Sequence, residues 1–161
     1  MYYHFKGKKG LFQAVVENVQ ESVAREVEKA AMLESNPWKS LVSGSKAFIR
    51  VMLSDENQRV LIVDAPTAIG LRLWEEIDDT YSGSYLYDHL KSMSAMGKLT
   101  NLSVEALTSM LSGAMDEVVM WVGKRDNKET AITEVGEIIE QMILAFKREV
   151  DSCGKKISKL L

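Results

Sequence analysis

Residues 103–123 read SVEALTSMLSGAMDEVVMWVG, and residues 127–146 read NKETAITEVGEIIEQMILAF. In both stretches apolar residues recur every three or four positions, which is the spacing of one buried face of an α-helix. The first face consists of Val104, Leu107, Leu111, Ala114, Val118 and Trp121, and the second of Ile132, Val135, Ile139, Met142 and Phe146. Ser103 can cap the first helix, and Asp126 or Asn127 the second. The two stretches predict an antiparallel helix pair over 103–124 and 127–150.

The apolar faces of this pair exceed what one hairpin can bury by itself. We therefore predict that they form a four-helix bundle with a second copy of the chain. The predicted dimer interface consists of Leu107, Leu111, Ala114, Val118, Trp121, Val135, Ile139, Met142 and Phe146. Small residues at 112–114 in the first helix, and Gly136 in the second, are expected to let the two backbones approach closely.

The first half of the chain also has helical periodicity. A long helix is predicted from about Lys9 to about Glu34, followed by a second helix that Asn36 caps and Pro37 begins. Lys8 and Lys9 stand at the start of the long helix, where cations oppose the helix dipole.

Two further helical segments are predicted in the middle of the chain. The first begins near position 55 and should end at Pro66, because the residue before proline is pushed out of the helical region. Its run 60–63, Val-Leu-Ile-Val, is apolar all round and is expected to be fully buried. The second is expected to be interrupted near Gly83 and to end at Gly97. No stretch alternates with period two, so the predicted fold class is all-α.

Composition narrows the class of protein. The chain has 161 residues, 46% of them hydrophobic and 27% charged, with a net charge of −3, as in a soluble globular protein of about one domain. The lone cysteine, Cys153, excludes a disulfide framework and a cysteine-cluster zinc site. No apolar run is long enough to span a membrane or to serve as a signal peptide, so a cytoplasmic location is expected.

The sequence offers little for catalysis. Its two histidines, His4 and His89, are too far apart in sequence to form a helical metal pair, and there is no HExxH motif, GxSxG motif or phosphate-binding loop. Asp88 precedes His89, but no activated nucleophile accompanies them. We predict that the protein is not an enzyme and needs no cofactor and no metal.

The start of the chain is an aromatic and basic cluster, YYHFKGKKGLF at residues 2–12, and Lys6, Lys8 and Lys9 face no acid among the first ten residues. Tyrosine, histidine and lysine side chains beside a helix start can contact DNA phosphates and base edges. By these residues alone, an aromatic cluster that packs against the helix start is an equally simple explanation.

This string resembles the end of the recognition helix and the start of the fourth helix in regulators of the tetracycline repressor (TetR) family. That signature reads roughly Leu-Tyr-x-His-Phe-x-x-Lys-x-x-Leu, with Met1 in place of the usual leucine. The resemblance implies that Tyr2, Tyr3, His4 and Lys8 contact DNA, and that Phe5 and Phe12 serve in packing. It also implies that 1–34 is the remnant of a helix-turn-helix domain and that 35–161 is an effector-binding and dimerisation domain. Because the family's first two helices do not occur in this sequence, we expect no sequence-specific DNA binding by residues 1–161 alone.

The rest of the chain is similar to one branch of the family's C-terminal domains. Asp64-Ala65-Pro66, then Ile69-Gly70 and Trp74, and the later run LSGA at 111–114 occur in the same order there.

Large, adaptable side chains are concentrated in the middle of the chain. Methionine and aromatic residues suit irregular pockets for apolar ligands, although ordinary core packing explains them equally well residue by residue. The resemblance implies an effector pocket here, and the predicted lining is Phe48, Met52, Trp74, Tyr81, Tyr85, His89, Met93, Met96 and Met110. A small apolar or aromatic effector is expected.

Together these observations predict a ligand-responsive DNA-binding regulator, with repression as the expected mode of action. The alternative is a dimeric all-helical ligand-binding or carrier protein without DNA-binding function.

Overall fold

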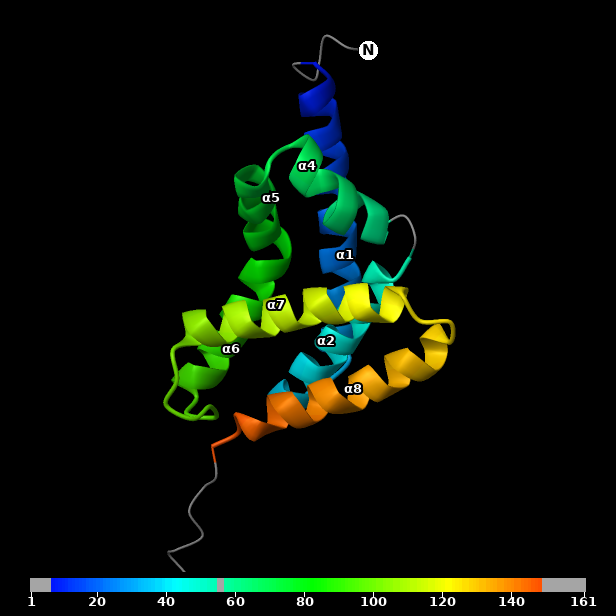
Figure 1. Cartoon of the computed structure of the whole chain (residues 1–161). Coiled ribbons are helices and arrows are strands. Elements are labelled where there is room, and N and C mark those ends of the chain that lie inside the picture. The colour runs from blue at the N-terminus through cyan, green and yellow to red at the C-terminus, as the bar shows by residue number, and fades with distance from the viewer. Residues whose placement is uncertain (1–6, 55–56, 149–161) are drawn as a thin grey trace, which may run out of the picture.

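The computed structural model describes residues 7–54 and 57–148 (Figure 1). Their helices are α1 (Lys8–Met32), α2 (Pro37–Met52), α4 (Ala65–Ala68), α5 (Leu71–Asp78), α6 (Ser84–Ala95), α7 (Val104–Gly123) and α8 (Lys128–Ala145), with π-helical segments η2 (Gln58–Asp64) and η3 (Asp79–Gly83). Within these ranges the only extended pairing is a single bridge between Leu99 and Lys147. The all-α prediction is therefore confirmed. None of the described helices has the length and apolar character needed to cross a bilayer.

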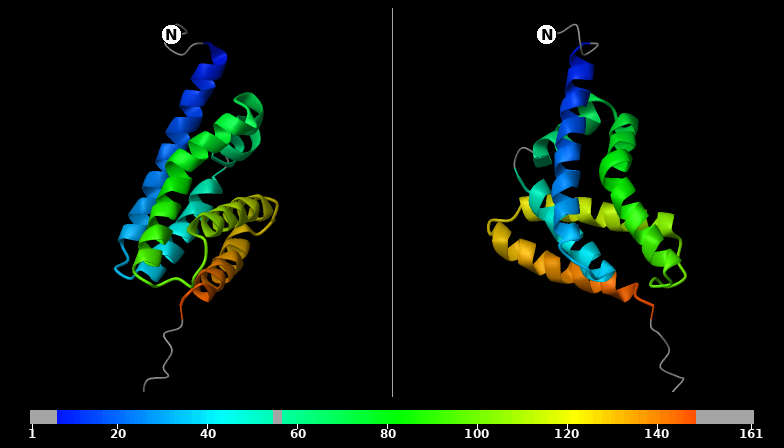
Figure 2. Two further views of the ribbon diagram at one scale, coloured as in Figure 1. Left: turned by 90° about the vertical axis from the view of Figure 1, so that its left-hand side faces the viewer. Right: turned by 180° about the vertical axis from the view of Figure 1, so that it is seen from behind.

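The helices are arranged around α1, the longest of them. The N-terminal end of α1 projects beyond the rest of the chain, while α7 and α8 lie at the opposite end, near its C-terminal half (Figures 1 and 2). The continuous helical run α5–η3–α6 passes along α1. Helix α2 also packs against α1, over much of the length of α2. Two ends of the molecule are thus joined by one helix, which at 1.5 Å per residue is about 37 Å long.

The helix starts follow the local chemistry expected of them. Asn36, Ser103 and Asn127 each accept a hydrogen bond from a backbone N–H of the first helical turn, at 2.9–3.2 Å. Asn127, rather than the alternative Asp126, caps α8. Gly97, with φ of 66°, ends α6 because a residue with positive φ is needed to satisfy the last carbonyls. The interruption predicted near Gly83 is the π-helical segment η3.

The prediction that Pro66 ends a helix is wrong. The helical path continues from η2 into α4, with Pro66 as the second residue of α4. In η2 the hydrogen bonds span five residues, as in the bond from the Ala65 N–H to the Val60 carbonyl, so the next donor in this register would be Pro66. Proline has no N–H, and the indole Nε1 of Trp74 donates to the orphaned Leu61 carbonyl at 2.7 Å instead. The helix survives because a side chain from α5 supplies the missing donor.

Two other expectations fail for related reasons. The run 60–63 is not fully buried, since Leu61 lies in the core while Val63 is 54% exposed, because η2 lies at the edge of the bundle with one face toward solvent. The second long helix does not reach residue 150, because α8 ends at Ala145. The chain then turns to pair with the segment before α7, and the Thr100 N–H donates to the Phe146 carbonyl at 3.1 Å.

The glycines of α7 and α8 do not bring these helices together. Gly113 is exposed, and a Cβ built there would meet nothing within 4 Å. Gly136 is buried against α2 instead, where a Cβ would lie 3.4 Å from Cε of Lys46. The small residue of α8 therefore makes room for the Lys46 side chain, which forms an ion pair with Glu140.

We expect Trp74→Phe to lower the free energy of unfolding by about 1–3 kcal/mol, because it leaves the Leu61 carbonyl without a donor. Trp121→Phe is the matched control, since Trp121 is 37% exposed and lies against the Arg125 guanidinium, and it should cost less. Chemical denaturation followed by circular dichroism measures both. In a Pro66→Ala background, where the new alanine regains a backbone N–H, the cost of Trp74→Phe should shrink. Equal costs in both backgrounds would contradict this account of η2.

Candidate ligand-binding site

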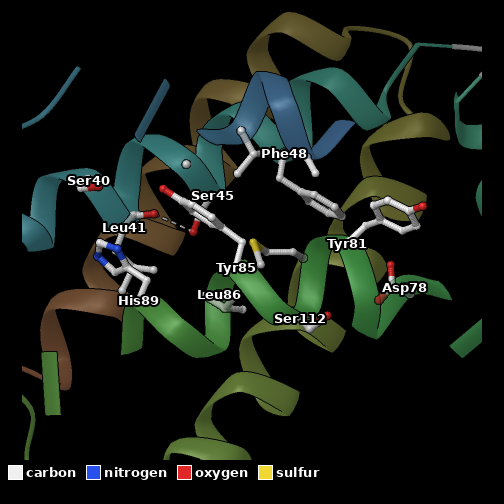
Figure 3. A pocket seen from close by; sticks show the side chains of 14 residues that line it. Ser40, Leu41, Ser45, Phe48, Asp78, Tyr81, Tyr85, Leu86, His89 and Ser112 are labelled. Atoms are coloured by element: carbon white, nitrogen blue, oxygen red, sulfur yellow. Dashed lines mark hydrogen bonds between the residues drawn. The ribbon is translucent and has the colours of Figure 1, made fainter. Parts of the chain in front are cut away.

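A cavity of about 50 Å³ lies inside the helical bundle where α1, α2, α6 and α7 meet (Figure 3). Its lining is mainly apolar and comes from residues far apart in the sequence. The lining residues are Ala24, Val27, Ser40, Leu41, Gly44, Ser45, Phe48, Asp78, Tyr81, Tyr85, Leu86, His89, Ser112 and Met115. Every long helix except α8 contributes to this wall, so a molecule bound there would contact most of the fold at once.

Aromatic rings from α2 and from the η3–α6 run line the cavity. The rings of Phe48, Tyr81 and Tyr85 lie along it, and the ring of His89 stacks on that of Tyr85 with a centroid separation of 6.4 Å (Figure 3). Nε2 of His89 is 2.9 Å from the Pro37 carbonyl oxygen. Because a carbonyl can only accept, Nε2 is the protonated nitrogen at this contact. The hydrogen bond fixes His89 as part of the wall.

A buried polar contact joins α1 to this wall. Gln20, only 3% exposed on the inner face of α1, donates from Nε2 to Asp78 at 2.7 Å. Burial raises the pKa of Asp78 above its usual value, the bond from Gln20 lowers it in part, and neighbouring Asp79 raises it further. The carboxylate of Asp78 is thus held in a poorly solvated place by a neutral partner.

A second carboxylate lies beside Asp78, on α7. Asp116 lines an open cleft of about 660 Å³ between the α5–η3–α6 run and α7, and Asp78 and Ser112 line both this cleft and the cavity. Burial, with a further contribution from the charge of Asp78, raises the pKa of Asp116 to about 7. Among the described residues Asp116 has no hydrogen bond and no ion pair.

The other side of the cavity opens between α1 and α6. Glu21, Glu28 and Asp88 line this opening, together with one cation, Arg25. Burial raises the pKa of the Tyr85 hydroxyl, and the charge of Glu28 adds to this effect. Carboxylates therefore border the aromatic cavity on both sides.

The predicted pocket residues fall into three groups. Phe48, Tyr81, Tyr85 and His89 line the cavity. Met52 and Met93 are buried in the core but outside the cavity lining, and Trp74 borders the adjoining cleft. Met96 and Met110 are 55% and 69% exposed, because Met96 caps the end of α6 and Met110 lies on the outer side of α7.

The predicted dimer residues are also divided by burial. Leu107, Leu111, Val135 and Ile139 are buried within this one chain. Ala114, Val118, Met142 and Phe146 are half-buried, and Trp121 is exposed. The apolar faces predicted from the sequence are thus largely buried within the chain itself. The outer apolar residues of α7 and α8 are Met110, Trp121, Ile138 and Leu144.

Of the predicted DNA contacts, Tyr2, Tyr3 and His4 lie outside the described residues. Lys8 is the first residue of α1 and is exposed, with no acidic residue in the first turn of that helix.

The sequence analysis missed the polar residues of the site, namely Gln20, Asp78 and Asp116 and the serines Ser40, Ser45 and Ser112. The signal for Gln20 was present, because it interrupts an apolar stripe of α1 that continues through Val16 and Val23. Asp78 and Asp116 gave no such signal, since each stands beside another acid in the sequence and looks like part of a solvated face. The part of the chain that the structure describes contains no group of three or more residues able to hold a metal ion.

Comparison with known proteins identifies this arrangement. Residues 38–146 match the family model of the tetracyclin repressor-like C-terminal domain. The chain belongs to the TetR family. The match covers every element from α2 to α8, including all of the cavity wall except the part from α1.

A solved structure agrees with this fold. The crystal structure of a TetR-family transcriptional regulator from Pectobacterium atrosepticum superimposes with a TM-score of 0.73 at 19% sequence identity, covering 91% of this chain and 75% of that one. No curated protein matches the sequence. TetR proteins are regulators and not enzymes, which agrees with the lack of catalytic motifs.

The raised pKa of Asp116 predicts how the stability of this TetR domain depends on pH. Between the usual pKa of 3.8 and the folded-state pKa of about 7, the folded chain binds more protons than the unfolded chain. The free energy of unfolding should therefore fall as pH rises across this interval. The loss is at most about 4 kcal/mol, and less where solvent reaches the carboxylate.

Asp116→Asn should remove this contribution, so that the variant is about as stable as the wild type near pH 4 and more stable at pH 8. Denaturation curves at several pH values measure the difference. Glu117→Gln, which removes an exposed charge next along α7, should follow the wild-type dependence. Parallel curves for wild type and Asp116→Asn would contradict the assignment.

Proposed function

We propose that this TetR-family chain is a ligand-responsive transcriptional regulator whose effector binds in the aromatic cavity. The observation that supports the proposal is that α1 extends from the predicted DNA-contacting end of the chain to the cavity wall. Lys8, one of the predicted DNA contacts, stands at its exposed start, and Ala24 and Val27 of the same helix line the cavity. From Lys8 to Ala24 the helix extends about 24 Å.

The Gln20–Asp78 hydrogen bond supplies a mechanism for coupling. It is a polar contact that holds α1 to the α5–η3–α6 run, and it lies at the edge of the cavity. A ligand that favours one position of this run over another would change the position of α1 through that bond. Only such a difference in affinity for the two arrangements can alter DNA binding. Coupling free energies of about 1–3 kcal/mol would change operator affinity by about 5- to 150-fold.

The regulator is further proposed to act as a homodimer in the cytoplasm. A two-fold dimer would present two reading heads to a pseudo-palindromic operator. The surface available for this contact is the outer side of α7 and α8, where Met110 and Ile138 are 69% and 57% exposed and Gly113 leaves the α7 backbone open. Apolar surface of this kind on a soluble domain is typical of an interface.

For the dimer, we expect the double variant Met110→Glu and Ile138→Glu to sediment as a monomer at micromolar concentration while keeping the wild-type circular dichroism spectrum. Leu111→Glu should instead unfold the chain, because Leu111 is buried in its own core. Met96→Glu is the matched control, since Met96 is comparably exposed on α6, and it should stay dimeric. A wild-type chain that is monomeric under these conditions would refute the interface.

For the ligand response, a thermal-shift screen of a hydrophobic library should yield compounds that stabilise the chain, by about 2.7 kcal/mol at a hundredfold excess over Kd. In a chain extended by the family's first two helices, such a compound should change operator affinity in a gel-shift titration. We expect Gln20→Leu to reduce the change caused by the compound more than it reduces operator affinity itself.

Gln13→Leu is the control for this variant, because Gln13 lies on the same helix and its side chain donates to Glu17, within α1 itself. Compounds that bind without any effect on DNA binding would favour the alternative, a helical carrier protein. Equal effects of the two glutamine variants would contradict coupling through Asp78.

A further inference from the structure

The aromatic cavity and the clefts beside it share an electrostatic feature that the proposed function does not use. Among the described residues, no lysine or arginine lines the cavity or the α7 cleft, whereas Glu75, Asp78, Asp79, Glu105 and Asp116 line the cleft. On the α1–α6 side, Arg25 is the single cation among the carboxylates that the structure places at that opening.

Of the carboxylates that line the cavity and the α7 cleft, Asp78 and Asp116 are half-buried, whereas the other three are exposed. Asp78 lines the cavity itself, below the ring of Tyr81 in Figure 3, and Asp116 lies one helical turn after Ser112, which lines cavity and cleft alike. Neither carboxylate has a cationic partner among the described residues. Two poorly solvated acids without a counter-ion are unfavourable, and a bound cation would stabilise both of them.

The aromatic wall has the complementary property. The faces of phenylalanine and tyrosine rings attract cations, and the attraction grows when the cation is removed from water. Phe48 extends into the cavity from α2, and Tyr81 and Tyr85 extend toward it from η3 and α6, with the Tyr81 ring next to Asp78 (Figure 3). A cation in this place could therefore contact both aromatic rings and a carboxylate.

Two serines of α2 add polar groups to the cavity wall. The hydroxyl of Ser45 donates to the Leu41 carbonyl at 2.9 Å, so its proton is already used within the helix. Ser40 is 8% exposed and lines the cavity as well. Hydroxyl oxygens can accept a further hydrogen bond, and an ammonium N–H is a suitable donor. The polar part of the wall thus offers acceptors, which suits a ligand that donates.

We propose that the ligand of this site is an organic cation, a protonated amine whose apolar body lies among Phe48, Tyr81 and Tyr85 and whose charge lies beside Asp78 and Asp116. The inference rests on the proposed effector function of the cavity. The carboxylates on both sides of the cavity would raise the local concentration of such a ligand and speed its entry. The raised pKa values of Asp78 and Asp116 support this assignment, since an arriving cation would favour their charged forms.

A cation bound beside the Asp78 carboxylate would also affect α1, because Gln20 of α1 donates to that carboxylate. Gln20 and the ligand would compete for the same carboxylate, so that a bound cation weakens the bond that holds α1 to the α5–η3–α6 run. A neutral molecule of the same shape would fill the cavity without this competition. The charge of the ligand, and not its volume alone, would then carry the signal.

Three indole compounds of similar size test the charge preference, namely tryptamine as the cation, tryptophol as the neutral analogue and indoleacetate as the anion. Isothermal titration calorimetry of the full chain at neutral pH should give tryptamine an affinity at least about tenfold above that of tryptophol, with indoleacetate weakest. Tryptophol or indoleacetate binding as tightly as tryptamine would overturn the inference and leave the effector function standing. No binding by any of the three would overturn the inference, and the effector function would then be decided by the thermal-shift screen of the hydrophobic library.

Two variants that each remove one negative charge distinguish a contribution of the site from that of the overall surface charge. Asp116→Asn should lower tryptamine affinity at least about tenfold and leave tryptophol affinity unchanged, whereas Glu117→Gln should leave both unchanged. Asp78→Asn should act like Asp116→Asn, and circular dichroism confirms that each variant is folded. Equal losses in Asp116→Asn and Glu117→Gln would show that the preference is a property of the whole surface and would refute the site.

Discussion

The hydrogen bond from Gln20 to Asp78 is the interaction on which the rest of this structure depends. A bond to a charged acceptor contributes about 1.5–3 kcal/mol, but its loss would leave a buried carboxylate without a donor, which costs more. The bond fixes the rotation of α1 about its axis, because only one face of α1 can present Gln20 to α5. With α1 fixed in this way, Ala24 and Val27 point into the cavity, and Val16 and Val23 enter the core. One polar contact thus positions both the cavity wall and the helix that leads to the N-terminal segment.

The fold could be predicted from the sequence wherever it is set by local chemistry. Asn36 and Ser103 cap helices as expected, because an N-cap involves only residues within one turn. Pro66 shows where local reasoning fails, since its helix continues only because Trp74, in the next helix, replaces the missing donor. Likewise, α8 ends at Ala145 because the following residues pair with a segment some 46 positions earlier, as in the contact of Thr100 with Phe146. Long-range partners of this kind leave no periodic signal in the sequence.

Only part of the site could be predicted from the sequence, for a similar reason. The resemblance to the family, together with the concentration of large side chains, predicts that aromatic residues of the middle helices line a pocket, and Tyr81, Tyr85 and His89 line the cavity. Methionine gave no such guidance, because it packs equally well in a core and on an interface, and Met110 is exposed. The carboxylates of the site were hidden by their neighbours. Asp116 lies beside Glu117 in the sequence, and only the helical turn separates the half-buried residue from the exposed one.

Helix α7 is apolar on more than one side, which has a consequence for regulation. Ser112 and Met115 line the cavity, Leu111 and Val119 lie in the core, and Met110 lies on the outer side. The exposed Met110 and Trp121 leave apolar surface on this outer side that a partner chain would cover. If a second copy of the chain covers the outer side, then the ligand and the partner chain both contact α7, while α1 is joined to the same site through Gln20 and Asp78. Linkage between binding equilibria is reciprocal. If the ligand changes the affinity for DNA by some factor, DNA changes the affinity for the ligand by the same factor. The same holds between the ligand and dimerisation. The acid at position 116 lies on this shared helix, close enough to Asp78 for that charge to affect its pKa, and is therefore placed to connect all three equilibria.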